Sequence, residues 1–433
     1  MIGRILDALA GRVASADAVI KTDDTLSVSI SPEGDTRVSE ARSHQSHLRV
    51  ARQGRIGFAS ATGDESSELV GRAMASAASG EELELFLPAP APLPNVVTRA
   101  PQSAAADAAV LTGLARALRD RLVRSHRRVE VWAERSSGGV QVANTRAVLA
   151  GYAVTLSGVG AVVESIGAES APPCRVHYAA VDLPTLADLE ALVAEVDRRL
   201  EPAVLSGAGR LSGLPVCFTP RALVTFLRPV RAALTGYEAL LGRSPLRGRL
   251  GEPVLDERLT LVDDPLIPGR PGSRPVDDDG VVSRRVSLVE RGRLIGFASD
   301  LMVGSRAGVP STGHAWRLPH AAPRVGLTNL LVEAGTHSPE ALLAELGRGV
   351  LIEDLDWGAG TNPVSGTIVL RAPWAYLVEG GAVRGRLEGV VLSGNVFEAL
   401  RRVRAIGSDA TWLGASCLPA LAVEGLEMVT SYQ

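Results

Sequence analysis

The amino-acid sequence predicts an α+β fold in two domains: an N-terminal antiparallel sheet with packed helices, and a β-rich C-terminal domain. Three runs between residues 25 and 62 (LSVSI, HLRVARQG and RIGFASAT) alternate polar and apolar side chains and are separated by Gly and Asp, which is typical of antiparallel strands. The segment SGAGRLSG at 206–213 is rich in Gly and Ser, and the chain after it is mostly β-like. The length of 433 residues allows two to three domains of about 150 residues each. We therefore place the two domains at 1–207 and 208–433.

The helices of the N-terminal domain follow from apolar residues that recur every three to four positions. In the second helix, Leu69, Ala73 and Ala77 lie on one face. The proline-rich stretch 86–102 predicts an extended connector, and the runs VEVWAE, GVQVAN and AVLAGYAVTL predict a β-meander that ends near Glu164. The predicted helices of this domain lie at 1–21, 64–80, 103–125 and 183–204.

The C-terminal domain opens with a strand, a sharp turn and a helix. The apolar run LPVCF ends at Thr219 and Pro220, which suit the N-cap and the first helical position. Apolar residues then recur at helical spacing, and the only ionisable side chains among them are arginines. Pro229 lies inside this pattern, where proline removes a backbone hydrogen bond and costs about 3 kcal/mol, so we expect the helix to kink or break. Further helices are predicted at 295–307 and 338–347.

Composition and charge exclude several classes of protein. The net charge is −3 at pH 7 and no basic stripe is present, so we expect no nucleic-acid partner. No apolar run approaches the roughly 20 residues that span a bilayer, and the N-terminus lacks the apolar core of a signal peptide, so we expect no membrane association. The three cysteines, Cys174, Cys217 and Cys417, form no Cys-x-x-Cys pair, which is typical of a reduced, cytoplasmic protein.

Histidines are the first candidates for chemistry. His44 and His47 are three residues apart in a predicted strand, so they point to opposite faces and we expect surface histidines. His314 and His320 lie six residues apart in a loop rich in Gly and Pro, which could bring them to one metal ion. No third ligand follows nearby, so ordinary loop histidines are favoured, and a metal site at this pair stays the alternative.

Clustered carboxylates are the second candidates. Residues 277–279 are three consecutive aspartates before a glycine, and Glu353, Asp354 and Asp356 precede Trp357. An acid–base pair needs two carboxylates that converge from different elements, whereas consecutive acidic residues beside glycine are typical of a solvated turn. We therefore expect solvated turns, with cation binding second. No phosphate-binding loop and no Gly-x-Ser-x-Gly elbow occurs in the chain.

A series of longer segments carries a resemblance to a known family. RIGFASATGDESSELVGRAMASA (55–77), RPVDDDGVVSRRVSLVERGRLIGFASDLMVGSRAG (274–308) and VVLSGNVFEALRRVRAIGSD (390–409) follow one another in the order and spacing of the TldD/PmbA family. STGHAWR (311–317) is similar to the Thr-Gly-Asn-Ala-x-Arg loop of its PmbA branch, also called TldE. The resemblance covers most of the chain and implies a TldD/PmbA-like fold.

The resemblance also implies what the arginine-bearing helix has lost. The TldD branch is a metalloprotease whose His-Glu-x-x-x-His helix binds zinc, and the TldE branch pairs with it without that motif. The equivalent positions here are Arg228, Pro229 and Ala233. Arg cannot ligate zinc, Pro carries no base and Ala has no ligand atom. Cys417, in GASCLP, lies in the region of the third ligand of the active branch, and we interpret it as a buried thiol.

The resemblance thus implies a non-catalytic TldE/PmbA-like subunit of a heterodimeric, cytoplasmic zinc metalloprotease that cleaves unfolded or modified peptides, such as peptide precursors or carrier conjugates. The partner would be a TldD-like paralogue with the His-Glu-x-x-x-His motif and would hold the zinc, with no cofactor in this chain. His314, Arg317 and Asn395 are candidate contacts to the substrate channel or the partner. The alternatives are a stand-alone hydrolase with a metal at His314 and His320, and a peptide-binding homodimeric scaffold.

Overall fold

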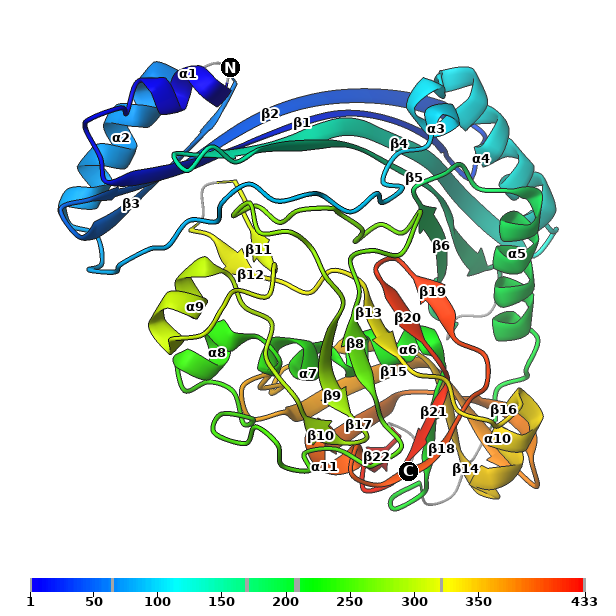
Figure 1. Cartoon of the computed structure of the whole chain (residues 1–433). Helices are drawn as coiled ribbons and strands as arrows, with labels where there is room; N and C mark the ends of the chain where they lie inside the picture. The colour runs from blue at the N-terminus through cyan, green and yellow to red at the C-terminus, as the bar shows by residue number, and fades with distance from the viewer. Residues whose placement is uncertain (1, 64–65, 168–170, 206–210, 320–321, 431–433) are drawn as a thin grey trace.

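The computed structural model describes residues 2–63, 66–167, 171–205, 211–319 and 322–430. A long curved sheet from the N-terminal half arches over a β-rich C-terminal body, and an extended connector runs between them (Figure 1). The predicted α+β class and its two parts are confirmed. Among the described helices, none combines the length and the apolar character needed to cross a bilayer.

The N-terminal sheet has six antiparallel strands in the order β3-β2-β1-β4-β5-β6. The long central strands β1, β2, β4 and β5 pair in one unbroken register, and polar and apolar side chains alternate in parts of them, such as LSVSI in β1. The strands are β1 (Ser15–Ile30), β2 (Thr36–Arg52), β3 (Arg55–Thr62), β4 (Arg127–Asn144), β5 (Leu149–Ser165) and β6 (Cys174–Ala180).

Helices cover the two ends of one face of this sheet. Ala18 of β1 packs in one cluster with α1 and α2, and Val28 of the same strand packs in another with α4 and α5. The two residues lie an even number of positions apart, so both clusters are on the same face. The second cluster also contains Trp374 and Tyr376 of the C-terminal half. The helices are α1 (Ile2–Asp7), α2 (Ser66–Ala78), α3 (Pro101–Ala105), α4 (Ala108–Leu122) and α5 (Leu186–Leu200).

Two elements of the N-terminal half differ from the prediction. The helix predicted for 1–21 ends at Asp7, and β1 begins at Ser15. The small apolar residues before residue 21 are compatible with a helix and with a strand, and pairing of β1 with β2 and β4 favours the strand. The helix predicted at 103–125 is divided into α3 and α4, since the Asp107 side chain accepts a hydrogen bond from the Val110 amide and starts a new helix. The predicted meander consists of two long strands, and β6 was not foreseen.

The C-terminal half contains an eight-stranded sheet, in the order β18-β21-β7-β14-β15-β17-β22 with β16 beside β15, and a six-stranded sheet in the order β10-β9-β8-β13-β20-β19. A short pair, β11 and β12, stands apart from both. One large apolar cluster fills the space that these sheets and the helices α6 and α7 enclose. The predicted helices at 295–307 and 338–347 are found in shorter form as α9 and α10.

The bounds of the C-terminal strands are β7 (Val216–Phe218), β8 (Leu261–Asp263), β9 (Val286–Glu290), β10 (Arg293–Leu294), β11 (Ala315–Trp316), β12 (Arg324–Val325), β13 (Leu330–Val332), β14 (Arg348–Trp357), β15 (Thr367–Glu379), β16 (Ala382–Leu387), β17 (Val390–Asn395), β18 (Val403–Ile406), β19 (Thr411–Leu413), β20 (Ser416–Leu418), β21 (Leu421–Val423) and β22 (Glu427–Val429). The helices are α6 (Pro220–Phe226), α7 (Arg228–Ala233), α8 (Gly236–Leu240), α9 (Leu301–Ala307), α10 (Pro339–Leu346) and α11 (Val396–Ala399).

The predicted domain boundary at 207/208 lies outside the described residues and stays a prediction. The two halves nevertheless touch along the connector. Its Pro88 carbonyl accepts from the Asn144 side chain of β4 over 2.9 Å, and its Val97 carbonyl accepts from Gly269 of the C-terminal half over 2.8 Å. The connector therefore lies between the two halves and contacts both (Figure 1).

Candidate functional site

The arginine-bearing helix of the sequence is broken, as Pro229 predicts. Strand β7 leads through Thr219 into α6, which ends at Phe226, and α7 begins at Arg228 with proline in its first turn. The linking residue Leu227 has φ −82° and ψ 0°, outside the regular α-helical values. The three motif-equivalent positions, 228, 229 and 233, all lie in α7, so the break separates them from α6 and not from one another.

Helix α7 carries arginine where the implied motif would carry its first ligand. Arg228 is exposed, and its guanidinium lies 5.0 Å from the centroid of the Trp357 ring. Ala233, at the last ligand position, is buried in the large apolar cluster. The two positions therefore face different environments. Arginine, proline and alanine supply no zinc ligand, so these residues do not fit the metal that the active branch binds.

A second arginine of α7 reaches towards β20. The Nη1 atom of Arg231 donates to the Ser416 hydroxyl over 2.8 Å. Burial lowers the pKa of Arg231, as does the nearby Arg228 charge, while Asp263 acts in the opposite direction. Cys417, the next residue of β20, is half-buried rather than buried as predicted, and burial raises the pKa of its thiol. Within the described part of the chain, no three His, Cys, Asp or Glu side chains gather into a metal-binding group.

The start of α6 is held by a chain of ion pairs from α5 and β14. Arg221 Nε lies 2.7 Å from Glu195 Oε1, and the same carboxylate lies 2.8 Å from Arg199. Arg199 Nε in turn lies 2.9 Å from Glu353 Oε2. Glu353 is buried and fully engaged, so the prediction of a solvated acidic turn at 353–356 is wrong for this residue, although Asp356 is exposed. These pairs position α6 and do not converge on a shared reaction point.

The aspartates at 277–279 are buried, which corrects the prediction of a solvated turn. Their exposed fractions are 0%, 1% and 0%. Asp277 accepts hydrogen bonds from the backbone amides of Asp279, Val281 and Ala315 at 3.0, 2.8 and 2.9 Å, so its carboxylate fixes the loop's own backbone. Burial and the neighbouring Asp279 raise its pKa to about 7, against the lowering effect of backbone donors.

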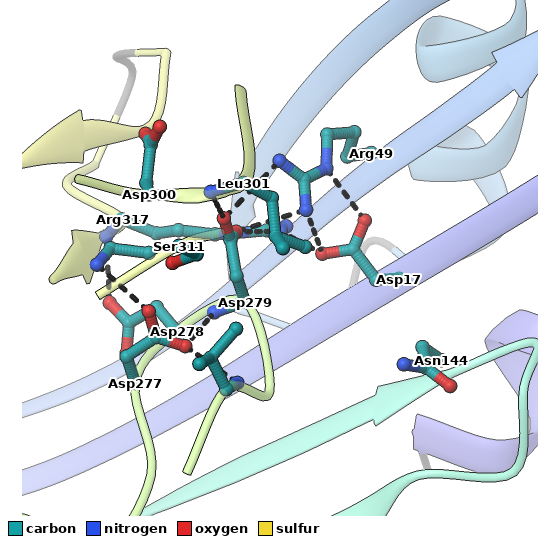
Figure 2. A network of polar contacts seen from close by, with 12 residues as sticks. Asp17, Arg49, Asn144, Asp277, Asp278, Asp279, Asp300, Leu301, Ser311 and Arg317 are labelled. Carbon is teal, nitrogen blue, oxygen red and sulfur yellow. Dashed lines mark hydrogen bonds and ion pairs between the residues drawn. The ribbon is translucent and has the colours of Figure 1, made fainter. Parts of the chain in front are cut away.

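Asp279 meets charged side chains of the N-terminal sheet (Figure 2). Arg49 Nη2 lies 3.0 Å from Asp279 Oδ1, and Arg49 Nε lies 2.7 Å from Asp17 Oδ1. Arg317 binds the same two carboxylates from the other side, with Nη2 3.1 Å from Asp279 Oδ1. All four side chains are at most 2% exposed. This buried network ties strands β1 and β2 to two loops of the C-terminal half, over separations of more than 200 residues.

The charges of the buried network are mutually compensated. Burial alone would raise the pKa of Asp279, but the guanidinium groups of Arg49 and Arg317 hold it below the ordinary value. Asp300, at the N-cap of α9, has a pKa raised by burial and by the Asp279 charge. Lys21, the one lysine of the sequence, adds a further link, with Nζ 2.6 Å from Asp278 Oδ2. The network is a structural connection between the halves.

The residues predicted to contact substrate or partner have internal partners. His314 is buried, with Nε2 2.9 Å from Asp263 Oδ2 and Nδ1 2.8 Å from Thr312 Oγ1, so it is not an ordinary loop histidine. His320, its predicted metal-binding companion, lies outside the described residues. Asn395 caps α11 by accepting from the Phe397 amide over 2.9 Å. The proposed contacts of His314, Arg317 and Asn395 stay predictions.

The histidines of β2 also differ from the prediction. His47 is 4% exposed and His44 is half-buried, so neither is a fully exposed surface histidine. His44 borders a groove of about 520 Å³ on the sheet, together with Thr22, Gly139 and Gly151. Thr22 shares its face with the residues that pack against α1 and α2, so the groove lies on the helix-bearing face. Its lining brings together no acid–base or metal-binding set.

Comparisons with known proteins agree with this architecture. Residues 212–430, just over half of the chain, match the family model described as the PmbA/TldA metallopeptidase C-terminal domain. A metalloprotease of Archaeoglobus fulgidus is 33% identical over 172 residues, 40% of each chain. A metalloprotease PmbA homologue of Haemophilus influenzae is 28% identical over 216 residues, 50% of this chain and 45% of that protein. The matches thus span less than half the length of these curated relatives.

Among solved structures, TldE from Thermococcus kodakarensis has the same fold, with a TM-score of 0.87 and 21% identity over 99% of both chains. A putative modulator of a DNA gyrase from Thermotoga maritima gives a TM-score of 0.85 and 20% identity, again over 99% of both. The structural likeness concerns the fold, and the C-terminal match identifies the family. The chain belongs to the PmbA/TldA metallopeptidase family, also written TldD/PmbA.

Proposed function

We propose that this chain is a non-catalytic, TldE/PmbA-like subunit of a cytoplasmic, heterodimeric zinc metalloprotease, and that a TldD-like paralogue supplies the zinc and the catalytic residues. The observation that carries the proposal is the set of residues on α7. Its exposed Arg228, its Pro229 and its buried Ala233 replace the residues that would hold zinc and activate water. A zinc peptidase needs neutral imidazoles for the ion and a carboxylate for the proton of the bound water.

The proposed role of this chain is to complete a binding surface for extended peptides. Strand β2 pairs with β3 only between Gln45 and Arg52, so among the described strands the segment 36–44 has a neighbour, β1, on one side. Such an edge offers main-chain donors and acceptors at regular spacing, and a peptide can add to it as a further strand. Main-chain recognition tolerates varied side chains, which suits a protease that acts on unfolded or modified peptides.

A matched pair of cleavage assays tests this function. The full chain is purified alone and after co-expression with a paralogue that contains His-Glu-x-x-x-His, and each sample receives the same unfolded peptide. We expect cleavage by the pair only, abolished by a chelator and by replacement of the partner's motif glutamate with glutamine. Chelator-sensitive cleavage by this chain alone, in a preparation free of partner, would contradict the proposal.

A further inference from the structure

Helix α7 presents two guanidinium groups without an anionic partner. Arg228 and Arg231 are three residues apart, which places their Cβ atoms about 5–6 Å apart on one side of a helix. Arg228 is engaged with the face of Trp357, and Arg231 with the Ser416 hydroxyl. Among the described residues, neither forms an ion pair with a carboxylate, whereas the buried Arg49 and Arg199 each meet two.

A further donor near the pair has no acceptor: the indole N–H of Trp357 is buried and has no hydrogen-bond partner in the described structure. The Asp263 carboxylate, which stabilises the charge of Arg231, accepts from His314 and from the Thr328 amide, at 2.9 and 2.8 Å. Asp263 therefore offsets part of the Arg231 charge, but among the described residues no carboxylate binds either guanidinium directly.

An uncompensated guanidinium that is half removed from water is costly unless an anion arrives to pair with it. Carboxylates match guanidinium donors geometrically, because both groups are planar and present two parallel hydrogen-bonding positions. The cation–π contact with the Trp357 ring restricts the Arg228 side chain and limits the side-chain entropy that an incoming anion would remove. Two neighbouring arginines, one of them restricted by this contact, form a preorganised receptor for such a group.

We propose that Arg228 and Arg231 form a binding site for a peptide carboxylate, either the C-terminal group or an acidic side chain. The proposal rests on the proposed function in one respect, namely that the ligand is a peptide. Arg228 provides the exposed half of the site, and Arg231, held by Ser416, provides the inner half. The site would bind the carboxylate of a peptide beside the β19–β20 hairpin.

Binding of three short peptides to the full chain tests the site. The probes are N-acetyl-Ala-Ala-Ala with a free carboxylate, its C-terminal amide, and N-acetyl-Ala-Glu-Ala amide, titrated by calorimetry and by tryptophan fluorescence. We expect the free acid to bind at least about tenfold more tightly than the neutral amide. Binding of the glutamate peptide at similar strength would show that side-chain carboxylates are accepted, whereas binding of the free acid alone would assign the site to C-terminal groups.

Variants localise the effect. Arg228→Gln with Arg231→Gln should abolish the preference for the carboxylate, and Arg228→Gln alone, at an exposed position, should reduce it with the fold intact. Arg116→Gln is the matched control, because Arg116 is an exposed arginine on α4, outside both the α7 pair and the β2 edge. The site would be overturned if the acid and the amide bound equally, or if neither bound at up to about 10 mM. It would also be overturned if the double variant kept the preference for the acid, or if the control variant lost it to the same extent. If the α7 site is wrong but the proposed function is right, this chain together with its partner should still cleave neutral, amidated peptides.

Discussion

At the scale of single residues, buried charge in this chain is tolerated because it is paired across the two halves. Arg49 shares its guanidinium between Asp17 and Asp279, and all three side chains are fully buried. Removing one member of such a group leaves the others uncompensated in a medium where a lone charge is costly. The contribution of the network to the free energy of unfolding can therefore be measured by removing one of its members. An exposed ion pair on the same strand serves as the control.

Arg49→Met should lower the free energy of unfolding by about 3–5 kcal/mol, because Asp17 and Asp279 lose one of their two shared cations while they stay buried. Denaturant unfolding of the full chain followed by circular dichroism measures the change. Arg42→Met on the same strand is the control: its pair with Asp24 has an arginine that is 82% exposed, and such pairs contribute less than about 1 kcal/mol. A similar small effect at both positions would show that the network adds little to stability.

Asp300→Asn should become progressively more stabilising, relative to the wild type, as pH rises from 4 towards 7. Burial and Asp279 raise the folded-state pKa of Asp300 above its unfolded value, while the backbone, Arg49 and Arg306 oppose them. Between the two pKa values the folded wild type retains a proton that the unfolded chain releases, so its stability falls with rising pH, by up to about 1.4 kcal/mol per pH unit. Asparagine keeps the N-cap and removes the titration.

The measurement is the free energy of unfolding of both proteins at several pH values between 4 and 7. Asp107→Asn, at the exposed N-cap of α4, controls for the cap substitution itself. Parallel stability curves for wild type and Asp300→Asn would contradict the assigned direction of the pKa change.

At the scale of elements, the α6–α7 unit keeps the strand-turn-helix layout but presents its residues differently from a metal-binding helix. The break at Leu227 follows from Pro229, and Ala233 is buried where α7 packs into the large apolar cluster. A ligand side chain introduced at position 233 would therefore enter the apolar core, whereas position 228 is exposed.

The combined variant Arg228→His, Pro229→Glu and Ala233→His should bind no stoichiometric zinc and should be less stable than the wild type. An imidazole at the buried position 233 overpacks the core, which typically costs about 1–3 kcal/mol. Elemental analysis and thermal melting measure the two effects, with Arg228→His alone as the control for an exposed substitution. About one zinc per chain in the combined variant would show that α7 can present both ligand positions to one ion.

Local chemistry explains which elements could be predicted. Thr185 and Asp188 form a capping box at the start of α5, and Pro229 marks the end of α6, because both signals act within a few residues. The burial of Asp278 and Asp279 could not be predicted, because their charged partners, Lys21 for the first and Arg49 for the second, lie more than 200 residues away in sequence. No local pattern distinguishes a buried acidic loop from a solvated one, and the same holds for His314, whose partner Asp263 is 51 residues away.

At the scale of the whole molecule, the curved sheet is fixed over the C-terminal body by three kinds of contact. The buried network joins β1 and β2 to loops of the C-terminal half, an apolar cluster joins α4 and α5 to Trp374 and Tyr376, and the connector contacts both halves. This arrangement holds the exposed β2 edge and the α7 arginines in fixed positions, which suits the subunit we propose, one that binds peptides and leaves the metal chemistry to its partner.

The zinc content of the tag-free full chain, measured alone and in complex with the His-Glu-x-x-x-His paralogue, tests this claim most directly. The account predicts less than about 0.1 zinc per chain for the isolated protein and about one zinc per heterodimer, lost when the partner's motif histidines are replaced. About one zinc bound by the isolated chain, and lost on His314→Ala, would contradict it and would favour an independent metal site in this subunit.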